Sequence, residues 1–145
     1  MRRILSLDYG DKNIGAALSC PLLITALGAG TIRRTDANSF KKPILSIREI
    51  IRNNDVGTIV LGFPKNMNGS LSPRSEKTLD FKERLQRNFK SMEIVLWDER
   101  LSSVASERIM HEMGTGRERM KEIVDEAAAI YILQGYLDFL NKNKL

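Results

Sequence analysis

The sequence is poor in cysteine, histidine and aromatic residues. Its 145 residues include one cysteine, Cys20, and one histidine, His111. A single cysteine excludes an internal disulfide and any zinc site built from several cysteines, and we expect Cys20 to be a small buried apolar side chain. Aromatic residues make up 6% of the chain. Base stacking can therefore supply little sequence readout of single strands, with Tyr9 and Trp97 the best placed.

Long apolar runs are also missing. No uninterrupted apolar segment approaches the roughly 20 residues of a membrane span, and the N-terminus lacks the apolar stretch of a signal peptide. We therefore expect a cytoplasmic protein that does not enter a membrane. A chain of 145 residues with 42% hydrophobic residues predicts a single globular domain over residues 1–145.

Positive charge exceeds negative charge. Lysine and arginine number 23 against 18 aspartates and glutamates, for a net charge of +5. A basic balance favours polyanionic partners without establishing them. The cations gather at Arg33-Arg34, at Lys41-Lys42, along a helix from Arg74 to Lys90, and at Arg117, Arg119 and Lys121. For each group, an ordinary solvated surface is the alternative interpretation.

The hydrophobic pattern predicts an α/β fold. Strands are expected at about 4–8, 14–20, 24–34, 57–62 and 93–97, and helices at about 39–54, 74–89, 102–113 and 122–141. Gly10, Gly15, Gly28 and Gly30 mark turns or bulges. The order βββαβαβα opens with a β-meander and contains two strand–helix–strand crossovers, which require parallel pairing and right-handed connections. We predict a five-stranded mixed sheet with helices on both faces.

Acidic residues stand where several of these elements end or begin. Asp8 closes the first strand, Asp98 and Glu99 follow the fifth, and Asp125 opens the apolar part of the last helix. Ligands of open α/β sheets gather outside the carboxyl ends of parallel strands, so Asp8 and the Asp98-Glu99 pair can share one edge. Helical spacing places Asp125 on the face that packs against the sheet, together with Ala128, Ala129, Ile132, Leu133 and Tyr136.

Converging carboxylates repel one another unless a cation neutralises them. Hard divalent cations such as Mg²⁺ or Mn²⁺ prefer oxygen ligands, and two such ions roughly 4 Å apart can activate water and stabilise the leaving oxygen of a phosphodiester. The pattern therefore predicts a metal site made of Asp8, Glu99 and Asp125, with Asp98 as an alternative ligand, and metal-dependent nucleic-acid hydrolysis. His111 is not needed and is expected on an exposed helix face.

Each acid also has a purely structural interpretation. Asp8 can form an Asx turn before Gly10, and Asp98 or Glu99 can pair with Arg100 or cap the following helix. Asp125 can simply stabilise the positive end of its helix dipole. The conjunction of the acids favours the metal site over these separate roles.

Four ordered motifs resemble the YqgF/RuvX family almost from end to end. They are Leu-Asp-Tyr-Gly-Asp-Lys-Asn-Ile-Gly-Ala-Ala from Leu7, Val-Leu-Gly-Phe-Pro-Lys-Asn-Met-Asn-Gly from Val60, Asp-Glu-Arg-Leu-Ser-Ser-Val from Asp98, and Val-Asp-Glu-Ala-Ala-Ala-Ile-Tyr-Ile-Leu-Gln from Val124. This is a family of bacterial proteins with a ribonuclease H-like fold, described as pre-16S rRNA nucleases and earlier as Holliday junction resolvases. The resemblance implies the same fold here.

The resemblance also implies roles for individual residues. Asp8, Glu99 and Asp125 correspond to the acidic metal-binding positions. The residues in motifs that would face substrate are Lys12, Asn66, Asn68, Arg74 and Arg100. Family members often carry Arg or Ser at position 13, Leu at position 63 and Asp at position 68, where this chain has Asn13, Phe63 and Asn68, and a changed loop can alter substrate preference.

The segment from Gly114 to Arg117 precedes the helix that carries Asp125. Its glycines predict a loop in which Arg117, Arg119 and Lys121 clamp phosphates beside the metals, and a flexible solvent loop is the alternative.

We therefore expect a nuclease that requires Mg²⁺ or Mn²⁺ and processes the 5′ end of pre-16S rRNA, on structured RNA, as a monomer or weak homodimer. A Holliday junction resolvase acting on branched DNA and a non-catalytic RNA-binding module in ribosome assembly remain alternatives. Phosphotransfer of the actin and sugar-kinase kind also uses a strand, an aspartate and a glycine turn, but it needs two such domains, for which 145 residues leave no room.

Overall fold

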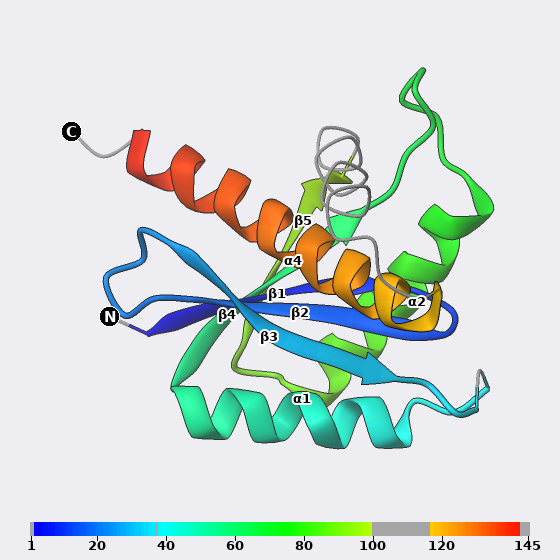
Figure 1. The fold of residues 1–145 in the computed structure, drawn as a ribbon, viewed down its shortest axis with the longest axis horizontal. Helices are drawn as coiled ribbons and strands as arrows, with labels where there is room; N and C mark the ends of the chain where they lie inside the picture. The colour runs from blue at the N-terminus through cyan, green and yellow to red at the C-terminus, as the bar shows by residue number, and fades with distance from the viewer. Residues whose placement is uncertain (1, 37, 100–116, 143–145) are drawn as a thin grey trace.

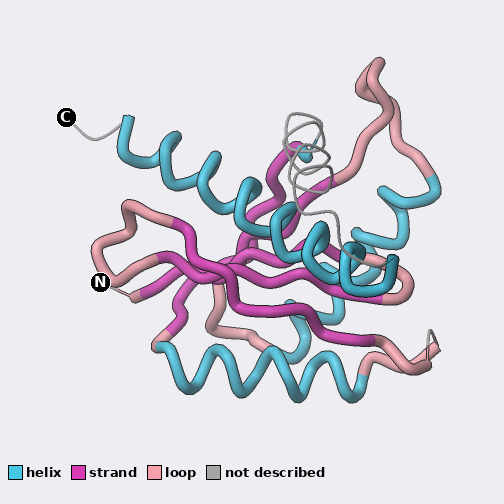
Figure 2. Tube along the Cα trace, in the orientation of Figure 1, coloured by secondary structure: helices cyan, strands magenta, loops and turns pink. Residues whose placement is uncertain are grey.

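The computed structural model describes residues 2–36, 38–99 and 117–142, which form five strands and three helices. In chain order these are β1 (Arg3–Tyr9), β2 (Asn13–Ser19), β3 (Ala26–Arg33), α1 (Lys41–Asn54), β4 (Val56–Phe63), α2 (Pro73–Asn88), β5 (Glu93–Asp98) and α4 (Arg117–Lys142). The strands lie in a single layer between helices (Figure 2).

The five strands form one mixed sheet in the order β3-β2-β1-β4-β5. The meander β1-β2-β3 is antiparallel, whereas β4 runs parallel to both of its neighbours, β1 and β5. This confirms the predicted meander and crossovers. The carboxyl ends of β1, β4 and β5 consequently lie at the same edge of the sheet.

Helices cover both faces of the sheet, as predicted. In Figure 1, α4 crosses one face and α1 lies along the other. Successive strand residues alternate between the two faces: in β1, Leu5 and Leu7 belong to the core that includes α1 and α2, and Ile4 belongs to the core under α4. All three side chains are buried. The sheet is therefore mainly apolar on both sides.

Local sequence fixes the ends of α1 and α2. Ser72 caps α2 and forms a reciprocal capping box with Ser75, and Pro73 occupies the first helical position, where its missing N–H costs nothing. Helix α1 ends at Asn54, followed by Asp55 in the left-handed conformation. The capped start of α2 is important for the site, because Arg74 lies in its first turn.

Helix α4 packs unusually close to the meander. A Cβ atom at Gly15 would overlap the backbone carbonyl of Asp125. The hydroxyl of Ser6 donates to the carbonyl of Ala129 across 2.7 Å, and the Glu126 carboxylate accepts from the N–H of Gly30 across 2.7 Å. Gly30 has a φ of +90° at an irregularity in the β2–β3 pairing, which confirms the predicted bulge. These contacts fix the height and rotation of α4 over the sheet.

Two predictions about residues 117–121 are wrong. Helix α4 begins at Arg117 rather than near Glu122, because residues 117–121 contain only good helix formers once Gly116 is passed. Arg117, Arg119 and Lys121 are therefore helical and not part of a loop, and their side chains lie outside the described residues. So do Gly114–Gly116, His111 and the helix expected at 102–113.

Cys20 is not buried as expected. It is partly exposed at the β2–β3 turn, where its sulfur accepts from the backbone N–H groups of Ile24 and Thr25, each at 3.4 Å. The hydrogen bonds from Thr25 and Ile24 lower the pKa of the Cys20 thiol. The residue thus helps to close a turn and does not fill a core.

Among the residues that the structure describes, no helix is both long and apolar enough to cross a membrane.

Replacing Gly15 with alanine tests the close packing of α4. The added methyl group must push α4 away from β2, so we expect Gly15→Ala to lower the free energy of unfolding by about 1–3 kcal/mol, the usual cost of overpacking. Urea unfolding followed by circular dichroism measures the change. Gly57→Ala is the comparison variant: its new methyl group would lie 2.9 Å from Arg2 Cβ near the chain terminus, and so would displace a side chain and not the backbone of a packed helix. Equal stability of the two variants would contradict the packing argument.

Candidate active site

Asp8 lies at the carboxyl end of β1, opposite Gly15 of β2. Asp8 is only 6% exposed, although an aspartate side chain is normally charged in water. The absence of a side chain at Gly15 is what leaves room for α4 above this position. Asp8 is thus enclosed by the meander and by α4, and its carboxyl faces the edge of the sheet where the parallel strands end.

Glu99 follows β5 and reaches the same place. Strand β4 lies between β1 and β5. Near its end stands Gly62, where a Cβ atom would lie 3.1 Å from Glu99 Oε2. The Glu99 side chain therefore crosses the end of β4 toward Asp8. Gly62 was not recognised in the sequence as a site residue, and its position just before the end of an apolar strand was the available signal.

Arg74 bridges the two acids from α2. Its Nη2 atom lies 4.0 Å from Asp8 Oδ1 and 3.8 Å from Glu99 Oε1, and it donates a long hydrogen bond to the Tyr9 carbonyl at 3.5 Å. The Arg74 side chain is 57% exposed, whereas those of Asp8 and Glu99 are 8% and 15% exposed. Arg74 therefore compensates part of the negative charge from the solvent side.

The two carboxyls hold more negative charge than Arg74 can neutralise. Burial raises the pKa of Asp8 well above its ordinary value, and the charges of Glu99 and Asp125 raise it further, against the opposite effect of Arg74. Burial also raises the pKa of Glu99, while Arg74 and a hydrogen bond with Asp8 lower it. Asp8 Oδ1 and Glu99 Oε2 are buried without an N–H or O–H donor from any described residue. The two carboxyls therefore lie together in a poorly solvated place, with only part of their charge compensated by Arg74.

Asp125 is close to this pair but does not join it in a ready-made cage. It lies in α4 beside Gly15 and raises the pKa of Asp8 through its charge. Within residues 2–36, 38–99 and 117–142, no three Asp, Glu, His or Cys side chains are grouped closely enough to hold a metal ion. The structure therefore brings two of the three predicted ligands into contact and places the third within electrostatic range.

Asp98 and Glu99 were both candidates for the acid after β5. Asp98 pairs with Phe63 in the β4–β5 ladder and its charge raises the pKa of Glu99, whereas Glu99 contacts Arg74 and raises the pKa of Asp8. The geometry favours Glu99 as the functional acid.

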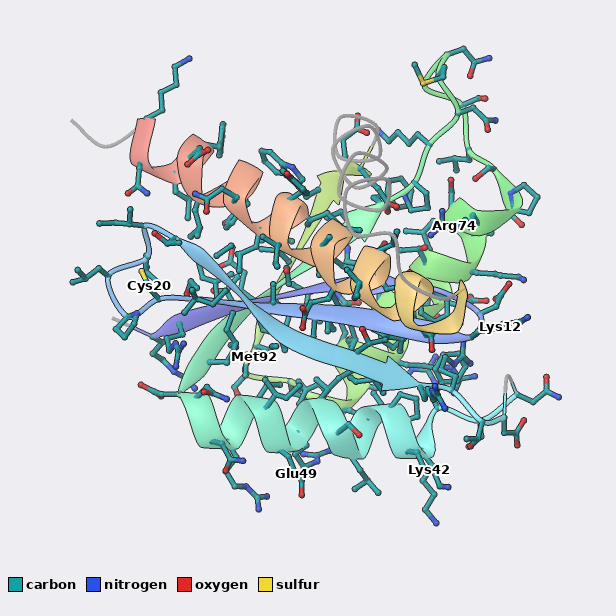
Figure 3. All side chains as sticks on the ribbon, in the orientation of Figure 1. Lys12, Cys20, Lys42, Glu49, Arg74 and Met92 are labelled. Carbon is teal, nitrogen blue, oxygen red and sulfur yellow. The ribbon has the colours of Figure 1, made fainter. Side chains whose placement is uncertain are left out.

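The other predicted substrate-facing residues in the described part of the chain lie around the site and make no hydrogen bond or ion pair with its carboxylates. Lys12 is exposed in the β1–β2 turn and lies on the same side of the molecule as Arg74 (Figure 3). Asn66 and Asn68 hold the turn of the loop before α2 through Ser70: Asn66 donates to its hydroxyl at 3.0 Å, and Asn68 accepts from its N–H at 3.0 Å. This loop projects from the body of the protein (Figure 1). Arg100 lies outside the described residues.

Glu126 is a residue near the site whose structural contact the sequence analysis missed. It stands next to Asp125, and its carboxylate binds Gly30 at the β3 bulge. A Cβ atom at Gly28 would meet this carboxylate at 2.7 Å. Glu126 therefore sets the rotation of the first turns of α4, and with it the position of Asp125. The signal in the sequence was a pair of adjacent acids at the start of an apolar helix.

Comparison with known sequences gives matches along nearly the whole chain. A family model described as "RuvX: Holliday junction resolvase" matches residues 2–139. A protein of Agathobacter rectalis named "Putative pre-16S rRNA nuclease" is 49% identical over 142 residues, which cover 98% of this chain and 99% of the relative. A Clostridium botulinum protein of the same name is 50% identical over 140 residues, covering 97% and 99%.

Comparison with solved structures supports the fold. Thermus thermophilus RuvC in complex with a Holliday junction substrate superposes with a TM-score of 0.59 at 12% identity, covering 99% of this chain and 97% of RuvC. A second T. thermophilus RuvC structure gives a TM-score of 0.51 at 8% identity, covering 96% of each chain. At such identities the likeness shows a shared ribonuclease H-like fold, as expected from the sequence motifs.

The buried pair predicts how stability depends on pH without metal. The folded state raises the pKa of Asp8 above 3.8 and that of Glu99 above 4.5. The stability that the two carboxyls contribute to the folded state is therefore complete below those ordinary values. It is lost as pH rises through the higher pKa values of the folded state. We expect the wild type, in a buffer with chelator, to lose stability over that window, and Asp8→Asn to be more stable near neutral pH. Thermal unfolding across pH measures both.

The exposed aspartate Asp11, which pairs with Lys77 at 3.2 Å, provides the control for this measurement. Asp11→Asn should keep the pH profile of the wild type. If Asp8→Asn also keeps that profile, the buried carboxyl pair does not carry the pH dependence.

Proposed function

Because the chain belongs to the RuvX family, we propose that it is a nuclease that hydrolyses phosphodiester bonds with Asp8 and Glu99 at the centre of its active site. Its substrate is the precursor of 16S ribosomal RNA, the substrate after which its relatives are named. The setting is ribosome biogenesis in the cytoplasm.

One observation carries this proposal: two buried carboxyls from different strands meet at the carboxyl edge of the sheet. Each has an oxygen without a donor from the described residues, and burial raises both pKa values. Buried acids that meet in this way favour a binding site for a cation over a structural role. A structural role would normally satisfy these oxygens with hydrogen bonds.

The donor set fits a divalent cation such as Mg²⁺ or Mn²⁺. Asp8 and Glu99 would hold it, and Asp125 would complete the ligands from α4, because all three supply the hard oxygen atoms that these ions prefer. When bound, one or two such ions supply charge stabilisation and an activated water for the reaction. A bound cation would favour the ionised form of both acids.

The protein itself orients the substrate. Arg74 lies on the solvent side of both carboxyls, with its guanidinium half exposed, so it can bind a phosphate oxygen of the strand. Its long contacts with Asp8 and Glu99, at 4.0 and 3.8 Å, leave its donors available. Lys12 and the loop of Asn66 and Asn68 extend the polar surface on either side.

Loss of the carboxylates should abolish both metal binding and cleavage. We expect Asp8→Asn and Glu99→Gln each to reduce cleavage of a pre-16S rRNA fragment by roughly 10²–10³-fold, the usual scale for removing one stabilising group from an active site. Both should also weaken Mn²⁺ binding in calorimetric titrations, which do not depend on activity. Asp98→Asn should have a much smaller effect on either measurement. An Asp98 variant as inactive as the Glu99 variant would move the ligand to Asp98.

Substrate choice is tested by presenting two nucleic acids to the same enzyme. Wild-type protein with Mg²⁺ or Mn²⁺ should cut a 16S precursor with an extended 5′ end faster than a four-way DNA junction, with Asp8→Asn as the blank. Faster cutting of the junction would replace RNA by branched DNA while leaving the nuclease site intact. Binding of RNA without cleavage of either substrate would favour a non-catalytic role in ribosome assembly.

A further inference from the structure

We propose that a pocket between α1 and α2 binds the phosphate backbone of the substrate strand at a distance from the cleavage site. This α1–α2 pocket has a volume of about 520 Å³ and is lined by Asn38, Ser39, Phe40, Lys41, Ile44, Leu45, Arg48, Arg84 and Asn88. The inference rests on the proposed nuclease function for the identity of its ligand. The pocket shares no residue with the carboxylate site.

The charge of the pocket is of one sign. Three of its lining residues, Lys41, Arg48 and Arg84, are cations, and none is an acid. Within the described part of the chain these three cations make no ion pair. Elsewhere Arg2, Arg74, Lys77 and Arg87 each have an acidic partner. Three uncompensated cations around one hollow repel one another, and an anion removes this repulsion.

Both arginines are oriented without being neutralised. The guanidinium carbon of Arg84 lies 4.2 Å from the centre of the Phe40 ring, and that of Arg48 lies 4.9 Å from the centre of the Phe89 ring. A cation–π contact holds the plane of a guanidinium and uses its face. The N–H groups at its edge remain available for the paired hydrogen bonds that phosphate accepts.

The start of α1 adds to the positive potential. Phe40 occupies the N-cap position and makes no side-chain cap, and the first turn contains no acid. The Lys41 N–H donates to the Ser39 hydroxyl at 3.4 Å, but no acidic side chain in the first turn offsets the positive end of the helix dipole. The neighbouring side chains Lys41 and Lys42 are both exposed.

A second hollow adjoins the pocket. It has a volume of about 290 Å³, shares Ser39 and Lys41 with the pocket and is lined by Arg34, Lys42 and one acid, Asp36, among others. One of its lining residues, Arg34, donates to the Tyr9 hydroxyl at 2.6 Å and to the Gly10 carbonyl at 3.2 Å, and Tyr9 and Gly10 follow Asp8 in the chain. Lys42, Lys12 and Arg74 lie on one side of the molecule (Figure 3).

These observations favour a polynucleotide over a small phosphate compound as the occupant. A single phosphate would be served by one of the two hollows. Two adjoining hollows that share Lys41, with Arg48 and Arg84 lining one and Lys42 the other, suit more than one phosphate of a strand. The pocket would then increase the affinity for long substrates and have little effect on short ones.

Charge removal in the pocket tests this assignment. The variant Lys41→Gln/Arg48→Gln/Arg84→Gln is made in the Asp8→Asn background, so that binding is measured without cleavage. We expect its affinity for an RNA strand of about 25 nucleotides to fall, and its salt dependence to flatten by about 2 in the slope of log K against log salt, since each phosphate contact on a single strand contributes roughly 0.7. A strand of about 6 nucleotides, within the site size of one binding groove, should bind both proteins almost equally.

The matched control removes three other exposed cations, in the variant Arg52→Gln/Lys90→Gln/Lys142→Gln. None of them lines either hollow, yet the change in net charge is identical. The control should keep most of the affinity and the original slope. Equal losses in the two triple variants would show that only net charge matters and would overturn the proposal.

Two further measurements keep the result interpretable. Thermal unfolding must show that the pocket variant is folded, and single replacements are used if it is not. Titration with inorganic phosphate and with adenosine monophosphate tests for a small ligand: tight binding that depends on the pocket, together with unchanged RNA affinity, would overturn the proposal. If the wild type cuts no nucleic acid, the nuclease proposal fails, whereas the RNA-binding comparison still decides the role of the pocket.

Discussion

The close contact between α4 and β2 at Gly15 is the constraint on which the site depends. The backbone of Asp125 occupies the space that a side chain at position 15 would need. Ser6 and Glu126 then fix α4 with hydrogen bonds to Ala129 and Gly30. These contacts enclose Asp8 and bring Asp125 within electrostatic range of it. Without them, Asp8 would be an ordinary solvated acid at the end of a strand.

Enclosure creates an electrostatic problem that the protein alone solves only in part. Asp8 and Glu99 are buried together, and Arg74 approaches them at 4.0 and 3.8 Å from a half-exposed position. The same burial that raises their pKa values makes a bound divalent cation more favourable, because the charge of the cation is poorly screened there. The proposed cation would relieve the repulsion between the two acids that Arg74 alone compensates only in part.

The basic residues around this edge have a different role. Arg74 is the cation that contacts the buried acids, whereas Lys41, Arg48 and Arg84 line a separate hollow between α1 and α2. Two aromatic rings, those of Phe40 and Phe89, orient two of those arginines. Tyr9 connects the carboxylate site with the α1–α2 pocket. Its ring stacks on Phe81 of α2 at 4.6 Å, and its hydroxyl accepts from Arg34.

The sequence by itself determined the chain order of strands and helices, the mixed sheet, the helices on both faces and the acids at the ends of β1 and β5, because periodicity and strand-end positions are local properties. It misjudged the start of α4 and the burial of Cys20, which depend on neighbours that local patterns do not show. Only the tertiary structure decided the order β3-β2-β1-β4-β5 in the sheet, that Glu99 and Asp8 lie close together, that Gly15 and Gly62 provide the necessary space, and that Glu126 contacts Gly30. These outcomes depend on distances between residues far apart in the chain, and such distances arise only when the sheet and α4 pack together.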